Sequence, residues 1–213
     1  KSGVLRVESG TADSSGLTMT GGVGDGAAAW VQGGATLNLS YSTLTGNNGG
    51  NGGAVHVHGT LYLDAVTVSG NTATGRAGGI DFHGADGGSI INSTISGNIA
   101  AGSGGGIATD VPITILNSTI AFNTGADAGG IFSENAGDVT ITNSILHNPV
   151  SGNANTTFIS GGSNIDSDGT AGLGDALDGV DPLLNALADN GGPTDTHSLQ
   201  VGSAAADAAG VAG

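Results

Sequence analysis

The sequence predicts an all-β solenoid of about six coils, with three short strands in each coil. A phrase that ends in a small-residue turn and an asparagine occurs five times, at spacings of 24, 27, 25 and 25 residues. Apolar residues alternate with Ser and Thr inside each phrase, which is typical of strands with one buried face. Paired glycines precede a second apolar strand in four repeats, at 52–53, 78–79, 105–106 and 129–130.

The first coil is predicted to be incomplete and to span residues 1–25. Its strands are expected at 4–7 and 17–20, and residues 27–31 are a degenerate copy of the glycine phrase. No amphipathic helix is apparent that would cover these strands. Because the end of a solenoid exposes strand edges, we expect an assembly face here. Its candidate residues are Val4, Leu5, Val7, Leu17 and Met19.

The middle coils align into three apolar columns. Two columns lie two residues apart in one strand, so their side chains point to the same side, and the third column follows a corner. Stacking at about 4.8 Å, the spacing of neighbouring strands, then builds a thin aliphatic core. The columns are Leu37, Leu61, Gly88, Ile113 and Val139; Leu39, Leu63, Ile90, Ile115 and Ile141; and Leu44, Val68, Ile95, Ile120 and Leu146.

Asparagines recur at the corners and are predicted to form structural ladders. Buried amides at such corners can hydrogen-bond to one another and to the backbone of adjacent coils, so we assign them no catalytic role. The turn column comprises Asn47, Asn71, Asn98, Asn123 and Asn148, and a second column comprises Asn92, Asn117 and Asn143.

One domain is expected, with coils over residues 1–160 and an acidic capping segment over 161–213. The capping segment is long and irregular. It carries enough leucines to fold over the last coil and hide its edges. These leucines are Leu183, Leu184, Leu187 and Leu199.

Composition excludes several classes of function. The chain has 18 acidic residues and three Lys or Arg, a formal net charge of −15. Three cations cannot form a phosphate-binding surface, so nucleic acid and anionic membranes are excluded as partners. Cysteine is absent, which excludes disulfides and thiolate chemistry. No run of about 18 apolar residues occurs, so no membrane-spanning helix is expected.

The alternating GG(I/V/A) and (S/A)xN phrases resemble the repeats of bacterial polymorphic outer membrane proteins and related secreted right-handed parallel β-helix proteins. After residue 161, the sequence motifs GVDPLL and LADNGGPTDTHSL are similar to the C-terminal region of choice-of-anchor Q proteins. The sequence departs from that second family at Ala171, where Cys is common, and at AAADAA, which replaces a proline-containing motif. The resemblance implies a right-handed parallel β-helix that is secreted, at the cell surface or extracellular. It implies no particular chemistry.

Catalysis is not expected, although parallel β-helices include pectate lyases and polygalacturonases. Such reactions need clustered carboxylates, or calcium beside a basic residue. Arg76 is the only cation after Arg6, and the acidic surface would repel an acidic sugar polymer. Scattered surface carboxylates are the simpler interpretation of the remaining acids, which do not form one ladder. These acids are Asp64, Asp81, Asp86 and Asp110.

Two histidines, with a third in the next coil, resemble a weak metal-binding pair. His56 and His58 alternate on one strand, and His83 belongs to the next coil. Because no third ligand is in evidence, we interpret them as solvated strand residues.

The strongest chemical signal is a possible calcium loop. Asn164, Asp166, Asp168, Gly169 and Asp175 match positions 1, 3, 5, 6 and 12 of a calcium-binding pattern, with Asp in place of Glu at the last position. Alternating oxygen ligands can surround Ca²⁺, but an Asx-rich turn that leads the chain out of the last coil fits the same residues. Both interpretations stay open.

Threonines form outward columns that suggest a further class of function. A flat T-x-T array is how some ice-binding proteins present hydroxyls and methyls, but Thr and Ser are also ordinary solvent-facing strand residues. The columns are Thr43, Thr67, Thr94 and Thr119, with Thr45, Ser69 and Ser96 two residues further on.

The uncovered first coil favours a secreted structural or adhesive subunit that self-associates end to end into a filament or stalk. The alternative is a cell-envelope module that binds or cleaves a polysaccharide, for which Asp64 and Asp81 are the residues to test. Partners would then be glycans or other surface proteins.

Overall fold

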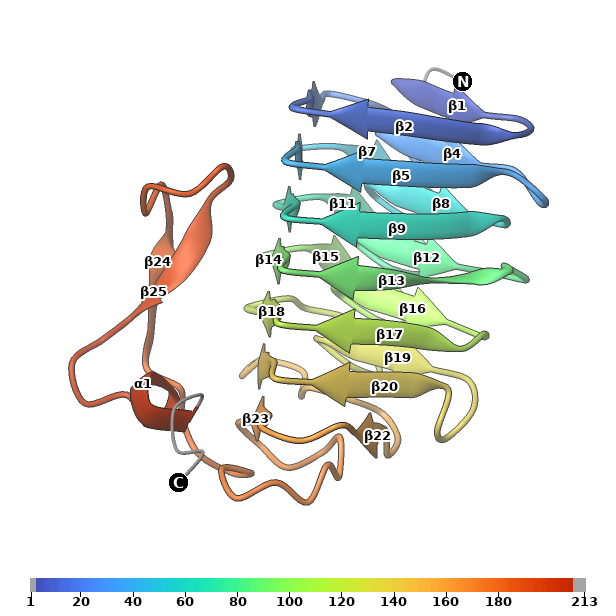
Figure 1. Ribbon diagram of the computed structural model, residues 1–213. Coiled ribbons are helices and arrows are strands. Elements are labelled where there is room, and N and C mark those ends of the chain that lie inside the picture. The colour runs from blue at the N-terminus through green and yellow to red at the C-terminus, as the bar shows by residue number, and fades with distance from the viewer. Residues whose placement is uncertain (1–2, 209–213) are drawn as a thin grey trace.

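The computed structural model describes residues 3–208 and confirms the predicted all-β solenoid (Figure 1). Three parallel sheets run the length of the molecule and contain six, seven and seven strands. We name them sheets I, II and III in the order in which the chain enters them within a coil. A minor sheet adds a fourth short strand to three of the coils: β7 (Asn48–Gly49), β11 (Thr72–Ala73) and β15 (Ile99–Ala100).

Sheet I contains the strands that follow the paired glycines. Their middle residues point outward, and the residues on either side face the core. The strands are β1 (Leu5–Val7), β4 (Ala29–Val31), β8 (Val55–Val57), β12 (Ile80–Phe82), β16 (Ile107–Thr109) and β19 (Ile131–Ser133).

Sheet II contains the longest strands of the coils. They carry the first two apolar columns, in the expected register. The strands are β2 (Thr11–Ser15), β5 (Thr36–Ser40), β9 (Thr60–Asp64), β13 (Gly87–Ile91), β17 (Ile113–Leu116), β20 (Val139–Thr142) and β22 (Ile159–Ser160).

Sheet III carries the third apolar column and, on its outer side, the threonines. Its last strand lies beyond residue 160, so the coils extend into the expected capping segment. The strands are β3 (Thr18–Thr20), β6 (Thr43–Thr45), β10 (Thr67–Ser69), β14 (Thr94–Ser96), β18 (Thr119–Ala121), β21 (Ile145–His147) and β23 (Ile165–Asp166).

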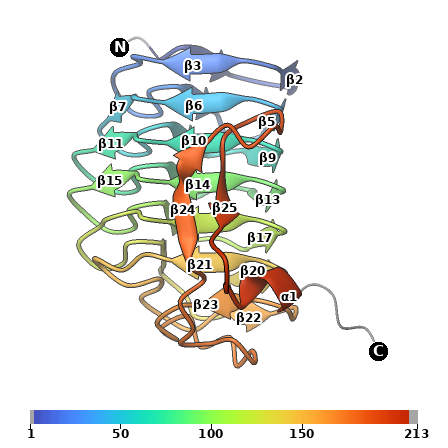
Figure 2. The same cartoon turned by 90° about the vertical axis from the view of Figure 1, so that its left-hand side faces the viewer.

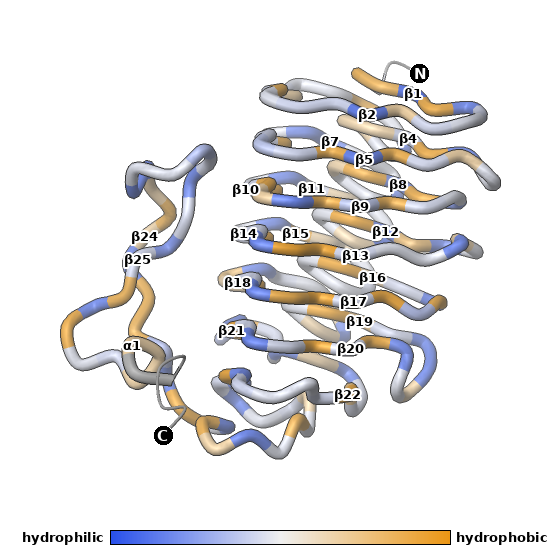
Figure 3. The backbone as a smooth tube through the Cα atoms, viewed as in Figure 1, coloured by the Kyte–Doolittle hydropathy of each residue, from blue (hydrophilic) through white to orange (hydrophobic). Residues whose placement is uncertain are grey.

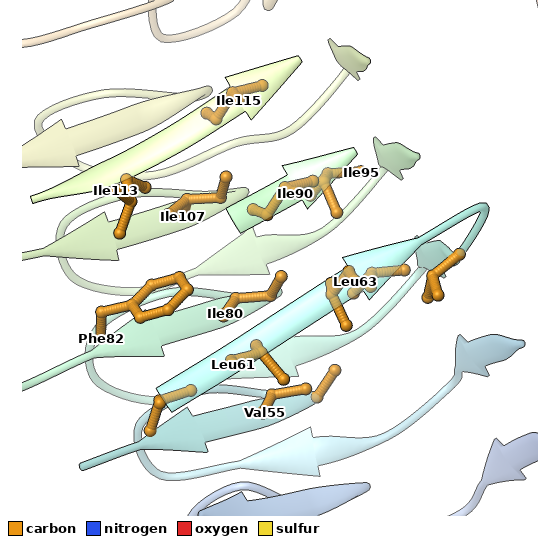
Figure 4. Packing of buried hydrophobic residues seen from close by; sticks show 14 of the residues in the cluster. Val55, Leu61, Leu63, Ile80, Phe82, Ile90, Ile95, Ile107, Ile113 and Ile115 are labelled. Carbon is orange, nitrogen blue, oxygen red and sulfur yellow. The ribbon is translucent and has the colours of Figure 1, made fainter. Parts of the chain in front are cut away.

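Aliphatic side chains of all three sheets meet in one continuous core (Figure 4). Hydrophobic positions accordingly recur along the strands of successive coils (Figure 3). Gly88 interrupts one aliphatic column because the ring of Phe82 fills that space. A Cβ atom at Gly88 would overlap the carbonyl oxygen of Leu61 and stand 3.1 Å from Phe82 Cε1. Large and small residues therefore complement each other across the core.

The turn asparagines form a buried ladder along the whole solenoid. Asn71 Nδ2, for example, donates to Asn98 Oδ1 at 2.9 Å and to the Leu44 carbonyl at 3.0 Å. The same pattern continues through Asn123 and Asn148 to Asn153. These amides satisfy backbone groups that the corners would otherwise leave unpaired.

The second asparagine column differs from the expectation of buried amides. Asn92, Asn117 and Asn143 are exposed and adopt positive φ angles of 50°, 50° and 48°. They occupy the sharp corner between sheets II and III, where a left-handed backbone is required and Asn is tolerated. Their side chains still bond along the outside, as in the 2.7 Å contact from Asn143 Nδ2 to Asn117 Oδ1.

The first coil is complete, contrary to the prediction. Strand β2 lies between β1 and β3 and pairs with β5 over Thr11–Ser15. The sequence concealed it because its inward positions are Ala12 and Ser14, which stand opposite Leu37 and Leu39.

Only the first part of the predicted capping segment, 161–213, covers the end of the core. The end of the core is closed by Phe158, Ala171 and Leu173. Strands β24 (Leu184–Ala188) and β25 (Thr196–Leu199) instead form an antiparallel hairpin, followed by the short helix α1 (Ala205–Ala208). The hairpin stands outside the coils and runs across sheet III (Figure 2). No helix in residues 3–208 is long and apolar enough to cross a membrane.

Candidate functional site

The outer face of sheet II carries a shallow hollow of about 460 Å³ in the first four coils. Serines and larger side chains share its lining, because outward positions of adjacent strands stack in register. The residues that line it on this face include Asp13, Ser15, Asn38, Ser40, Tyr62, Asp64 and Ser89.

Tyr62 supplies the aromatic surface of this hollow. Its side chain stands on β9 at the centre of the lining and is 47% exposed, so its ring is available to a ligand. Tyr ring faces are apolar while the hydroxyl remains polar, which suits an amphipathic ligand.

Two carboxylates stand on the same face. Asp13 Oδ1 accepts a hydrogen bond of 2.6 Å from Asn38, and Asp64 Oδ1 accepts one of 2.9 Å from Asn92. Both side chains are exposed and retain acceptor capacity for a ligand. The hollow therefore combines an aromatic surface with hydrogen-bond acceptors that can fix the orientation of a ligand.

The structure separates the four acids that the sequence analysis singled out. Asp64 belongs to the hollow on sheet II, whereas Asp81 is buried on the outer side of sheet I. Asp86 accepts a hydrogen bond from the Gly34 amide, and Asp110 accepts bonds from the Gly84 amide. Asp64 and Asp81 thus belong to different faces of the molecule.

A histidine cluster occupies the outer face of sheet I. His56 Nδ1 lies 3.1 Å from Asp81 Oδ2, and His56 Nε2 lies 2.9 Å from His58 Nε2. His83 Nδ1 lies 3.1 Å from Asp110 Oδ2 in the next coils. Burial, together with the neighbouring His56, lowers the pKa of His58.

Aromatic and basic residues surround this cluster. The Trp30 ring lies 4.7 Å from the His56 ring and 5.4 Å from the His58 ring, between centroids, with the Arg6 guanidinium over its face. Arg76 reaches Asp81, Glu134 and the Phe132 ring. The buried His56 and half-buried His58 are thus packed into an ionic network, in contrast to the expected solvated strand residues, whereas His83 is exposed as predicted.

Alignment on the paired glycines could have revealed both faces. Middle residues of the sheet I strands form one column: Arg6, Trp30, His56, Asp81, Ala108 and Phe132. Outward residues of sheet II likewise place Asp13, Asn38 and Tyr62 in one row. Asp13, Asn38, Tyr62 and Trp30 were missed because the outward positions of sheets I and II were not aligned between coils.

The predicted calcium residues terminate two internal ladders. Asn164 Oδ1 accepts from the Ser144 amide at 3.0 Å, at the end of a ladder of buried serines. Asp166 Oδ1 accepts from Asn153 at 2.7 Å, at the end of the asparagine ladder. Burial raises the pKa of Asp166 to about 6.

Asp168 and Asp175 complete these hydrogen-bond networks. Asp168 accepts from the amide and hydroxyl of Thr170 and from the Asn153 amide, and its pKa is lowered by these bonds in spite of burial. Asp175 accepts from Ser160 and from Asn164 Nδ2. Calcium binding stays a prediction, and an ion would have to replace these protein donors.

The threonine face is not open. Thr67, Thr94 and Ser96 are buried. Thr67 Oγ1 donates to the Asp195 carbonyl of the hairpin at 2.6 Å, and Ser96 Oγ lies 2.8 Å from His197 Nε2. The expectation of a flat, exposed T-x-T plane is therefore wrong for the middle of sheet III.

The proposed assembly residues divide between core and surface. Val7 and Met19 are buried in the core, and Leu5 is half-buried. Val4 and Leu17 are exposed by 54% and 38%. Within residues 3–208, β1, β2 and β3 each pair with another strand on one side only.

The family model described as "right handed beta helix region" matches residues 3–171. No curated protein and no solved structure matches the chain. The match covers most of the chain and all the coils described above. The chain therefore belongs to the right-handed β-helix family.

Proposed function

We propose that this protein is an extracellular or cell-surface β-helix module that binds an uncharged oligosaccharide in the hollow on sheet II. The observation that carries this proposal is the half-exposed Tyr62 ring in one hollow with the exposed carboxylates of Asp13, two strands away, and Asp64, two residues along β9.

Sugars match this arrangement chemically. A sugar ring presents C–H groups on one face, which pack on an aromatic ring, and hydroxyl donors around its edge. Ionised carboxylates accept such hydroxyls in charge-assisted hydrogen bonds. Asn38 and the serines of the lining add weaker donors and acceptors. The net charge of −15 favours a neutral ligand over an acidic polymer.

The extracellular location is part of the proposal. It is supported by the resemblance of the repeats to secreted bacterial β-helix proteins, and of residues after 161 to choice-of-anchor Q proteins. Catalysis is not part of it. The two carboxylates of the hollow each bond to an asparagine and serve as hydrogen-bond acceptors.

A neutral-glycan array followed by calorimetry tests the binding. We expect saturable binding that Tyr62→Ala weakens by about tenfold or more, since aromatic anchors dominate binding energies. Tyr41→Ala is the matched control, because Tyr41 is 53% exposed and does not line the hollow. Equal loss in both variants, or no binding to any neutral glycan, would refute the proposal. Release of reducing ends would add cleavage to the function.

A second candidate function is end-to-end self-association, which the unpaired edges of β1, β2 and β3 support. Exposed strand edges are templates for pairing with a second copy. Light scattering over a range of protein concentrations, with and without Ca²⁺, tests it. A constant monomer mass under all conditions would exclude assembly into a filament or stalk.

A further inference from the structure

We propose that His56 and His58 bind a divalent transition-metal ion of tetragonal preference, Cu²⁺ or Ni²⁺, through their Nε2 atoms. This site lies on sheet I and is independent of the hollow on sheet II.

The strand geometry brings the two ligands together. His56 is the middle residue of β8 and points to the outer side of sheet I, and His58 directly follows the strand with its ring centroid 4.6 Å from that of His56. Their Nε2 atoms lie 2.9 Å apart. In the metal-free protein this distance allows one imidazole to donate a hydrogen bond to the other.

The separation, which is a hydrogen-bond distance in the metal-free protein, also suits one metal geometry. Two nitrogens with metal bonds of about 2.0–2.1 Å lie about 2.9 Å apart when they are cis ligands at 90°, and about 3.3 Å apart in a tetrahedral site. The observed 2.9 Å matches the cis arrangement. Tetragonal nitrogen and oxygen sites suit Cu²⁺ and Ni²⁺ more than Zn²⁺.

Asp81 stands where the outer-shell partner of a metal-bound histidine is usually found. A ligating imidazole commonly directs its other ring nitrogen toward a carboxylate. His56 Nδ1 lies 3.1 Å from Asp81 Oδ2, an ion-pair contact that is not aligned as a hydrogen bond. His56 and Asp81 are 5% and 1% exposed. His56 Nδ1 and Asp81 Oδ1 have no aligned hydrogen bond within residues 3–208, and they are held by ion-pair contacts to Asp81 Oδ2 and, at 3.4 Å, to Arg76 Nε.

The protein supplies only two ligands in this proposal. Within residues 3–208, no three His, Cys, Asp or Glu side chains surround a common point as a closed metal site requires. His83, the nearest further imidazole, has its ring centroid 6.0 Å from that of His58 and faces Asp110. Water molecules therefore occupy the remaining positions, on the half-exposed side of His58.

Trp30 provides a built-in reporter. It is the only tryptophan of the chain, and its ring packs against both histidines. Bound Cu²⁺ or Ni²⁺ should quench its fluorescence in a saturable way, with one ion per chain. The Cu²⁺ paramagnetic resonance spectrum should show coupling to two imidazole nitrogens.

The test titrates the full chain with NiCl₂ and with CuSO₄ while Trp30 fluorescence is recorded. We expect His58→Ala to abolish saturable quenching, and Asp81→Asn to weaken metal affinity by about 10–100-fold. His147→Ala, which changes a histidine on sheet III, is the matched control and should bind as the wild type does.

Circular dichroism and thermal melting show whether each variant is folded. His58 is only half-buried, so its variant should fold even if Asp81→Asn does not. Quenching that does not saturate in the wild type, or that persists unchanged in folded His58→Ala, would overturn the proposal.

Discussion

The outer faces of sheets II and III are built from similar residues, but only the face of sheet III is covered by another part of the chain. Both present short polar side chains in register over the same aliphatic core. Sheet III is covered by the hairpin of β24 and β25, so Thr67 is fully buried, whereas Tyr62 on sheet II is 47% exposed. Whether a face of the solenoid is accessible to a ligand therefore depends on what covers it as much as on its own residues.

The hairpin contacts sheet III through side-chain hydrogen bonds. Thr67 donates to the Asp195 carbonyl, and Ser96 meets His197. The His197 ring also lies 5.1 Å from the Phe122 ring, between centroids. Because it docks through a few polar contacts, the hairpin is expected to detach from sheet III more readily than the coils unfold.

The largest expected effect concerns the scaffold that the two faces share. Asn98→Ala removes buried hydrogen bonds to Asn123, the Val68 carbonyl and the Asn71 amide, so groups in the two neighbouring coils lose partners. Because each buried unsatisfied group costs about 1–3 kcal/mol, the free energy of unfolding should fall by at least about 3 kcal/mol. Urea denaturation measures this loss.

Asn117→Ala is the control for that prediction, because Asn117 is exposed in the outer ladder. Placing Ala at its positive φ costs about 1–2 kcal/mol. If both variants lost the same stability, the buried ladder would not be the main support of the coils.

Acidity should act on the same scaffold through Asp166. The folded state raises the pKa of this carboxyl from 3.8 to about 6, because the group is buried. The folded protein then binds more protons than the unfolded chain between these values. The contribution of Asp166 to stability is therefore full below about pH 3.8 and is lost as the pH rises to about 6.

Urea denaturation from pH 3.5 to 7 of the wild type and of Asp166→Asn, which cannot titrate, isolates this contribution. The difference between the two proteins should change in that window. A constant difference would show that Asp166 does not titrate there.

The two faces should respond differently to loss of one hydroxyl. Thr67→Val removes the hydrogen bond to the hairpin and should weaken hairpin docking by about 1 kcal/mol. Thr114→Val makes the same change on exposed sheet II and should alter stability by less than about 0.5 kcal/mol. Limited proteolysis of the hairpin, together with urea denaturation, measures both effects. Equal protection of the hairpin in the two variants would contradict the assigned contact.

The smallest expected effect is a pH-dependent loosening of the hairpin. Burial lowers the pKa of His197 from 6.5, with the nearby His147 acting in the same direction. The detached hairpin binds a proton more readily than the docked one. Docking is therefore strongest above about pH 6.5 and weakens as the pH falls toward the lowered pKa.

Amide NMR signals of β24 and β25 between pH 7.5 and 5 report this loosening, with sheet II strands as an internal reference. His197→Gln should remove the pH dependence. If the hairpin and sheet II changed alike, the effect would belong to the whole solenoid.

The inward half of the structure could be predicted from the sequence because it repeats. Each aliphatic column stacks on its own kind, so Leu44, Val68 and Ile95 align without any knowledge of the other sheets. Prediction failed where the repeat weakened. Strand β2 was missed because it carries Ala12 and Ser14 in place of large aliphatics. Gly88 was placed in the correct column, but the Phe82 ring beside it belongs to another sheet and was not foreseen.

Sites on the outside were less accessible to sequence reasoning. Asp64 was a candidate and Tyr62 lies on the same strand, but the other polar residues of the hollow lie 24 or more residues away and are brought together by coil stacking. The candidate calcium residues were found as a motif. Their roles as the ends of the asparagine and serine ladders emerged only from the hydrogen bonds of Asp166 and Asn164.

The sequence by itself determined the coil, the inward ladders and the buried asparagines, because these depend on local alternation and a regular period. The tertiary structure alone decided which outer face is free. Hairpin docking joins residues about 100 or more positions apart, such as Ser96 and His197, and no periodic signal encodes such a contact. It also decided that His56, Asp81 and Trp30 meet, since outward neighbours are set by the register between coils.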